Sequence, residues 1–163
     1  MFSLSIEKMD KMNDELIKIV EDLYNNDIIL NADGIFDKKA IKAWEKQSHL
    51  HQPSQKTIIP FTKDEVAHDS ILKAAKILPF LLKRTKKKAT TSSYGLKHYV
   101  ERTISTQYNG SYISNGQLIL AMLYLKYEYK LDEFGSWNCK FLADYVKNDY
   151  WDNNNMRPHH LLI

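Results

Sequence analysis

Apolar residues recur at every third or fourth position near the start of the chain, and this spacing constrains the fold more than any other feature. The residues that fall on one helical face are Ile6, Met9, Met12, Leu16, Ile19, Val20 and Leu23. Such a stripe is typical of an amphipathic helix that packs one side against a core. Glycine and proline number only five and four, which is too few for the many turns of a β-sandwich or barrel. The sequence therefore predicts a mainly α fold.

We expect three segments along this mainly α chain. Residues 1–52 are predicted to form an N-terminal helical hairpin or three-helix module, because the turn signal Asn31-Ala32-Asp33-Gly34 separates two helical patterns. Residues 53–90 are predicted to form a linker and a linking helix that ends in a basic run. The capping box Thr62-Lys63-Asp64-Glu65 starts that helix, and Pro79 should kink or break it.

The third segment, residues 91–163, is predicted to form a C-terminal helical module with a docking tail. Ser114 is a natural N-cap with Gln117 at the capping-box position, and the apolar run over residues 118–125 predicts the central buried helix. The alternation in residues 127–131 leaves open a small β pair with residues 137–146. The spacing of apolar residues in 141–146 instead favours a last helix.

The stretch Lys83-Arg84-Thr85-Lys86-Lys87-Lys88 places five cations in six residues. Residues 71–102 hold nine lysines and arginines against one glutamate, a local charge of +8 in a chain whose net charge is +3. Such asymmetry predicts an anionic partner, either nucleic acid or an acidic protein surface. A solvated helix end is the alternative, since cations favour helix C-termini. The predicted partner-binding residues are Lys83, Arg84, Lys86, Lys87, Lys88, Lys97 and Arg102.

Aromatic residues are concentrated in the last forty residues, more than a core of this size can bury. Tyrosine and tryptophan are favoured at the centres of protein interfaces, and the chain ends in the apolar sequence Leu161-Leu162-Ile163. The residues that we predict to form a protein interface are Trp137, Tyr145, Trp151, Leu161 and Leu162.

No catalytic or metal-binding motif emerges from the histidines and the single cysteine. His49-x-His51 and His159-His160 lack the second ligand pair of a zinc site. Cys139 stands beside Phe141 and is expected to be buried and inert, although a Cys139–His98 nucleophile pair is the enzymatic alternative. We therefore predict a non-enzymatic protein with no catalytic residues, no metal site and no cofactor.

Two resemblances add to this interpretation. Asp33-Gly34-Ile35-Phe36, followed by Ala40-Ile41-Lys42-Ala43-Trp44-Glu45, resembles the peptidoglycan-binding-like three-helix domains over roughly residues 16–50. It departs from them at Asp37-Lys38-Lys39, where that family has Gly-Pro-x-Thr, and it implies a small helical binding module. Tyr94-Gly95-Leu96-Lys97-His98 and Tyr112-Ile113-Ser114-Asn115-Gly116 resemble a segment, spanning residues 92–139, of uncharacterised proteins from large DNA viruses and phages. That resemblance implies a helical module in a virus-encoded protein.

The charge pattern of the N-terminus and the absence of long apolar runs bear on location. Glu7, Lys8 and Asp10 interrupt the first ten residues, which therefore lack the apolar core of a signal peptide. No run approaches the roughly 20 apolar residues that a membrane span needs. We expect the protein in a virion, or in the cytoplasm or nucleus of a host cell.

Two functional hypotheses follow. The first is a structural or assembly component, associated with a virion or capsid and bound to partner subunits through its aromatics, basic segment and apolar tail. The alternative is a sequence-independent nucleic-acid-binding protein that uses residues 83–88, or an inhibitor of a host nucleic-acid enzyme. Residues 118–125 carry no charge and cannot read base edges, so any nucleic-acid contact should go to the backbone.

Overall fold

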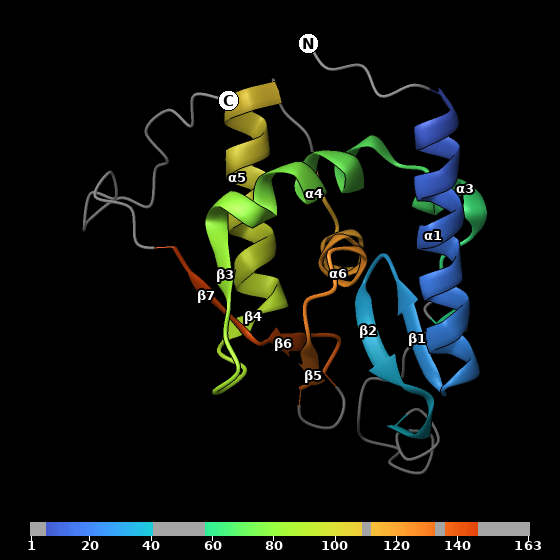
Figure 1. The fold of residues 1–163 in the computed structure, drawn as a ribbon. Helices are drawn as coiled ribbons and strands as arrows, with labels where there is room; N and C mark the ends of the chain where they lie inside the picture. Colours follow the sequence, from blue (N-terminus) through green and yellow to red (C-terminus); the bar gives the residue numbers. More distant parts are fainter. Residues whose placement is uncertain (1–5, 41–57, 109–111, 133–135, 147–163) are drawn as a thin grey trace.

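The computed structural model describes residues 6–40, 58–108, 112–132 and 136–146 (Figure 1). Its helices are α1 (Ile6–Asn25), α3 (Lys63–Val66), α4 (Asp69–Leu81), α5 (Ser93–Tyr108) and α6 (Asn115–Tyr124). Its strands are β1 (Ile28–Asn31), β2 (Gly34–Asp37), β3 (Leu82–Arg84), β4 (Thr91–Ser92), β5 (Tyr129–Leu131), β6 (Cys139–Phe141) and β7 (Ala143–Tyr145).

The fold is mixed α/β, so the prediction of a mainly α chain with at most one β pair was wrong. The described residues form three small antiparallel sheets, with strand orders β1-β2, β3-β7 and β4-β6-β5. β5 does pair with β6, but residues 139–145 form two strands rather than the favoured last helix. Strands of two to four residues are too short for their alternation to stand out in a sequence.

The described part of the N-terminal segment contains a β-hairpin, which the predicted helical hairpin or three-helix module does not include; the second predicted helix begins at residues 38–40. Helix α1 leads into a β-hairpin in which Ile29 pairs with Phe36 and Leu30 with Ile35. The predicted turn is present: Asn31 Oδ1 accepts from the amide of Asp33 at 3.0 Å. The residues on both sides of this turn are strands and not helices. One residue of each strand, Leu30 of β1 and Ile35 of β2, is completely buried against the core. The continuation beyond residue 40 lies outside the described residues.

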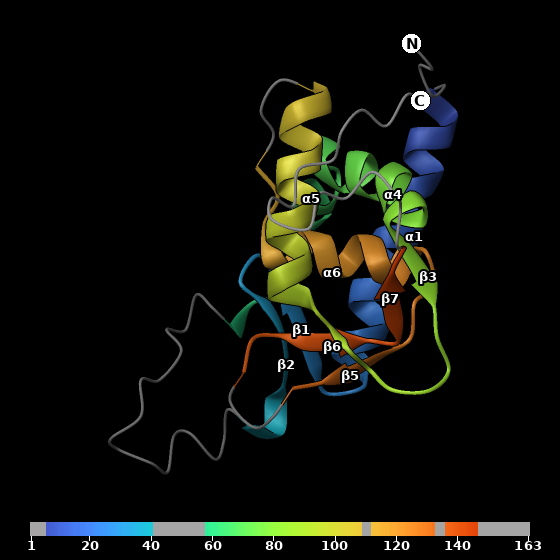
Figure 2. The same ribbon diagram turned by 90° about the vertical axis from the view of Figure 1, so that its left-hand side faces the viewer.

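Helix α6 is the central buried helix, as predicted from its sequence. It crosses the middle of the molecule, with α1, α4, α5 and the β1-β2 hairpin packed around it (Figure 2). Its apolar residues from Leu118 to Met122 are completely buried. Ser114 caps it with the predicted capping box: Ser114 Oγ accepts from Gln117 N at 3.1 Å, and Gln117 Oε1 accepts from Ser114 N at 3.0 Å.

The three predicted segments share one hydrophobic core. Leu16 and Leu30 from residues 1–52, Leu78 from residues 53–90, and Leu118 and Phe141 from residues 91–163 all belong to the same cluster of buried side chains. Burial of this apolar surface around α6 is the main stabilising contribution to the fold.

The linking helix does not extend into the basic run. The predicted capping box at Thr62 is present, but it starts only the single turn α3, and His68 caps the longer helix α4. Pro79 is accommodated inside α4, which ends two residues later at Leu81. Leu82 is extended (φ −129°, ψ 143°), and Lys83 pairs with Asp144 of β7. The start of the basic run is therefore a strand, held in that conformation by pairing with a segment about sixty residues further along the chain.

The tip of the β1-β2 hairpin is joined to the start of α6 by polar contacts and a close backbone approach. Asn115 Nδ2 donates to the carbonyl oxygens of Asp33 (3.1 Å) and Trp137 (3.2 Å). The amide of Gly116 donates to Ala32 O at 3.2 Å. A Cβ on Gly116 would lie 1.6 Å from Asn31 O, so no other residue fits there without moving the hairpin.

This close approach gives the first prediction. Gly116→Ala should lower the free energy of unfolding by about 3 kcal/mol or more, because the new methyl group overlaps a backbone oxygen. Gly95→Ala is the matched control: nothing lies within 4 Å of its Cβ position in α5, so it should raise stability by about 0.5 kcal/mol. Urea unfolding followed by circular dichroism measures both. Equal effects of the two substitutions would contradict the close contact.

Candidate anion-binding surface

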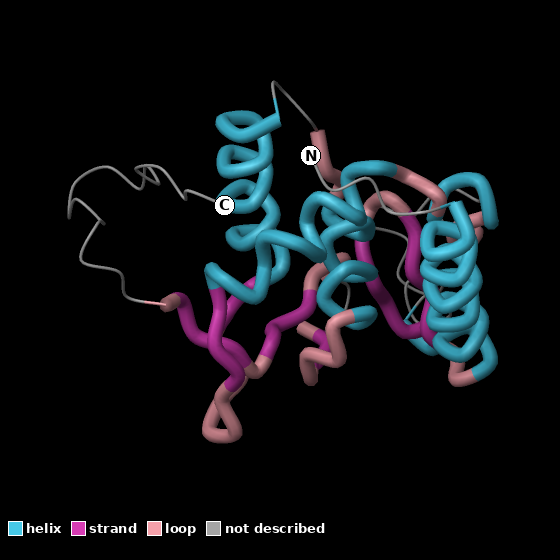
Figure 3. The backbone as a smooth tube through the Cα atoms, turned by 45° about the horizontal axis from the view of Figure 1, so that its top comes forward, coloured by secondary structure: helices cyan, strands magenta, loops and turns pink. Residues whose placement is uncertain are grey.

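Residues 83–90, here called the basic loop, comprise the last two residues of β3 and the connection to β4. Figure 3 shows the connection projecting beyond the strands at one end of the molecule. Lys83, Lys86, Lys87 and Lys88 are exposed. Among the described residues, none of these four lysines has a carboxylate within ion-pair distance. The loop therefore presents four ammonium groups to solvent.

Both ends of the basic loop are fixed to the corner between β6 and β7. At the first end, the amide of Thr85 donates to Leu142 O at 3.0 Å. At the other end, Thr90 Oγ1 donates to Ala143 O at 3.0 Å and to Asp144 Oδ1 at 3.1 Å. These bonds hold the base of the loop in place, so its lysines emerge from an ordered support.

Arg84 differs from the lysines of the loop because its side chain makes contacts within the protein that stabilise the fold. Its guanidinium donates to the carbonyl oxygen of Leu125, the C-cap of α6, and lies 4.7 Å from the centroid of the Tyr127 ring. A cation at this point stabilises the free carbonyls of a helix end. Burial raises the pKa of Tyr127, and the Arg84 charge offsets part of that rise. Arg84 therefore anchors the basic loop to the core.

Lys97 and Arg102, the other two predicted partner-binding residues, lie on α5 and already have contacts within the chain. Lys97 is buried, with its Nζ 3.0 Å from Glu101 Oε2 and 4.7 Å from the centroid of the Tyr112 ring. Arg102 Nε donates to the carbonyl oxygen of His98 at 3.2 Å. Of the seven predicted residues, the structure brings Lys83, Lys86, Lys87 and Lys88 together on one exposed loop.

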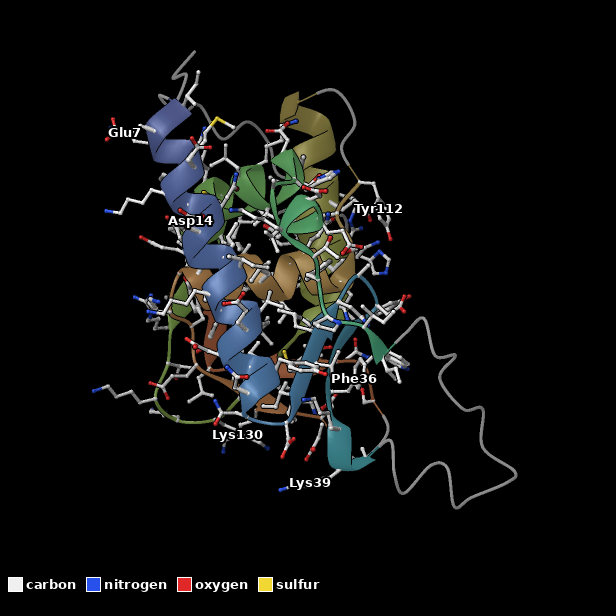
Figure 4. All side chains as sticks on the ribbon, turned by 90° about the vertical axis from the view of Figure 1, so that its right-hand side faces the viewer. Glu7, Asp14, Phe36, Lys39, Tyr112 and Lys130 are labelled. Atoms are coloured by element: carbon white, nitrogen blue, oxygen red, sulfur yellow. The ribbon has the colours of Figure 1, made fainter. Side chains whose placement is uncertain are left out.

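Two further lysines that the sequence did not single out lie on the neighbouring sheet. Lys140 is exposed between the buried residues Cys139 and Phe141, and its register partners are Ser92 on one side and Lys130 on the other. Lys130 and the basic loop lie at the same end of the molecule, the lower end in both views (Figures 1 and 4). Only the strand register makes these lysines neighbours, so their spacing in sequence gives no direct signal.

The pairing of Lys130 with Lys140 is electrostatically unfavourable. Like charges on directly opposed residues destabilise a sheet. Asp132 compensates in part, because its Oδ1 lies 3.3 Å from Lys140 Nζ. An anion bound on this face would relieve the remaining repulsion. We include Lys130 and Lys140 with the four loop lysines in the candidate surface.

The nucleophile alternative at Cys139 finds no support in the geometry. The thiol is completely buried in the core, and burial raises its pKa to about 12. The His98 ring packs edge-on against Tyr94 and lies 3.7 Å from Glu101 Oε2. Within the described ranges, no group of three or more histidine, cysteine, aspartate or glutamate side chains is arranged to hold a metal ion.

The predicted protein interface is only partly described. Trp137 is half-buried and packs edge-on against Phe36, with ring centroids 4.5 Å apart. Tyr145 is exposed on one side and meets the buried Tyr99 edge-on at 5.5 Å. The other three residues, Trp151, Leu161 and Leu162, lie outside the described residues.

Comparisons with known proteins add no relative. No protein-family model matches the chain, and neither the curated proteins nor the solved structures yielded a match. Over the described part of the chain, no helix is both long enough and apolar enough to span a membrane.

The role of Arg84 gives a second prediction. Arg84→Ala should lower the free energy of unfolding by about 1–2 kcal/mol, because it removes a charged hydrogen bond and a cation–π contact. Lys83→Ala, one residue earlier, should change it by less than about 0.5 kcal/mol. Urea denaturation compares the two variants. A Lys83→Ala variant as destabilised as Arg84→Ala would argue against an anchoring role specific to Arg84.

The pKa of Cys139 gives a third prediction. At pH 8 the native thiol should remain protonated and react with iodoacetamide more than about 100-fold more slowly than in the urea-unfolded chain. Because the pKa is higher in the folded state, this group's contribution to stability is lost as pH rises from about 8.5 towards 12. Mass spectrometry of the alkylated protein measures the rate. Rapid alkylation under native conditions would contradict the burial.

Proposed function

We propose that this protein binds the phosphate backbone of nucleic acid, without sequence preference, through the basic loop and the adjoining sheet. The observation that carries the proposal is a lysine-rich loop held at both ends by hydrogen bonds from Thr85 and Thr90, with four exposed lysines. Lys130 and Lys140 extend the positive surface onto the sheet.

The chemistry of the loop suits a phosphate chain. Each lysine that neutralises a phosphate releases counterions, which supplies most of the affinity in sequence-independent binding. A loop whose ends are already fixed loses less conformational entropy on binding than a free tail of the same composition. Ser92, on the neighbouring strand, adds a hydroxyl group of the kind that commonly contacts phosphate oxygens.

Recognition of bases has no such support. Helix α6 is enclosed by the other elements and cannot enter a groove of the duplex. Tyr145 pairs with Leu82, and successive residues of a strand point to opposite faces, so its ring lies on the face of β3-β7 away from Lys83. The loop itself holds no aromatic residue on which a base could stack. We therefore expect similar affinities for duplexes of different sequence.

We place this binding within a larger assembly, as the first of the two sequence-based hypotheses does. The resemblance of residues 92–139 to proteins of large DNA viruses and phages supports a virus-encoded assembly that contains nucleic acid. An acidic protein surface is the competing partner for the same lysines. Its carboxylates do not form a continuous chain of closely spaced charges, so the salt dependence of binding separates the two partners.

The test is a salt titration of binding to a fluorescent 20-base-pair duplex, followed by anisotropy. Replacing Lys86, Lys87 and Lys88 together by alanine should make the slope of log K against log salt less steep by about 2.7, because three phosphate contacts are lost. Replacing Lys130 and Lys140 by alanine should reduce the slope by about 1.8. Two duplexes of unrelated sequence should give the same values.

The control is a triple alanine variant at Lys8, Lys11 and Lys76, which carries the same change in net charge. All three are exposed. Glu7 and Asp14, which lie on either side of the two α1 lysines in sequence, are toward the opposite end of the molecule from Lys130 (Figure 4). This variant should keep the wild-type slope. If both triple variants lose affinity equally, net charge alone explains the binding, and if the loop variant binds as tightly as wild type, the proposal fails.

A further inference from the structure

Helices α1 and α4 both pack against α6 but hardly touch each other, and a groove of about 420 Å³ runs between them. Four residues of α1 line one wall, at positions i, i+3, i+4 and i+7 of a single stripe: Lys8, Lys11, Met12 and Glu15. The other wall and the floor are formed by Leu72, Ala75 and Lys76 of α4 and by Tyr124 and Leu125 at the end of α6. The groove therefore has the form of a channel between two helices.

The floor of the groove is apolar and incompletely covered. Residues 118–122 of α6 are completely buried, but Tyr124 and Leu125 are only partly buried, as are Met12 and Leu72. Among the described residues, α1 and α4 thus leave part of the apolar surface at the end of α6 open. Partly covered apolar side chains that line a channel are typical of a site that receives another apolar surface.

The apolar stripe of α1 continues beyond the groove. Met9 and Ile6 lie one and two turns before Met12 on this helix, and they are 44% and 80% exposed. The stripe that predicts α1 from the sequence is therefore longer than the core that covers it.

The rim of the groove is positively charged. Lys8, Lys11 and Lys76 surround it, against the single acidic residue Glu15. None of these three lysines is ion-paired within the part of the chain that the structure describes. An apolar channel with a cationic rim complements an occupant that is apolar on one side and acidic on its edges.

We propose that this groove binds an amphipathic, acidic helix of a partner protein. A helix with apolar residues at i, i+3, i+4 and i+7 places these side chains along one stripe, which matches a channel between two helices. Glutamates and aspartates beside that stripe meet Lys8, Lys11 and Lys76. The groove begins near the base of the basic loop, because the carbonyl oxygen of its residue Leu125 accepts from Arg84. Its α1 wall leads away from the loop: Glu7 and Asp14, which neighbour that wall in sequence, lie toward the opposite end of the molecule from Lys130 (Figure 4).

The probe is a fluorescein-labelled 15-residue peptide with leucines at the four anchor positions and one turn beyond them, and glutamates at most other positions. A matched peptide has lysine in place of every glutamate. With the full-length protein, the acidic peptide should bind at least about tenfold more tightly than the basic one. Equal binding of the two peptides, or no binding of the acidic one, overturns the proposal.

Two protein variants test the site itself. Alanine at Lys8, Lys11 and Lys76 should weaken binding of the acidic peptide about tenfold, since partly exposed ion pairs each contribute a fraction of a kcal/mol. Alanine at Lys86, Lys87 and Lys88, the same change in charge, should leave it unchanged. Met12→Gln keeps every charge and should also weaken binding, because it replaces the apolar side chain of the α1 wall. Wild-type affinity in both groove variants overturns the proposal.

A spectroscopic measurement locates the bound peptide. With ¹³C-methyl-labelled methionine, the signal of Met12, which lines the groove, should shift on adding the acidic peptide, whereas that of Met122, buried inside α6, should not. Sedimentation velocity without peptide tests the rival occupant. A dimer that disappears in the Lys8, Lys11 and Lys76 variant would assign the groove to a second copy of this chain and overturn the proposal.

Discussion

Burial of the apolar helix α6 is the interaction on which the rest of the structure depends. Its residues Leu118 to Met122 have no exposed surface, and elements from every part of the described chain pack around them. A helix that is apolar on all sides is stable in water only when it is enclosed. The other helices and the β1-β2 hairpin therefore pack around α6 and shield it from water. Where they do not enclose it fully, apolar surface is left exposed.

The two proposed surfaces, the basic loop and the groove between α1 and α4, both lie where this packing around α6 ends. At one end of α6, Arg84 binds the terminal carbonyl group and so brings the basic loop to the edge of the core. Close to the same end, α1 and α4 diverge and leave Tyr124 and Leu125 partly open. Together, the two proposals describe an adaptor, which would hold nucleic acid and a protein subunit at the same time.

Sequence reasoning recovered the parts of the fold that local signals encode. The stripe of α1, the capping boxes at Thr62 and Ser114, and the burial of α6 all depend on residues within a few positions of each other. Strands β3 and β4 depend on distant partners: β3 pairs with β7 across about sixty residues, so Lys83 and Arg84 could not be recognised as a strand. The candidate surface was predictable as a cluster of charge, but the inward role of Arg84, the burial of Lys97 and the pairing of Lys130 with Lys140 required the tertiary structure.

The contacts that attach the basic loop to the rest of the fold do not involve the lysines that give the loop its charge. The bonds that fix it involve Thr85, Thr90 and Arg84, whereas the ammonium groups of Lys86, Lys87 and Lys88 have no ion-pair partner among the described residues. Substitution at these three lysines is therefore nearly neutral for stability. Natural selection can add or remove positive charge there in single mutational steps, and so adjust the strength of the proposed attachment to an anion over a wide range, while the scaffold stays intact.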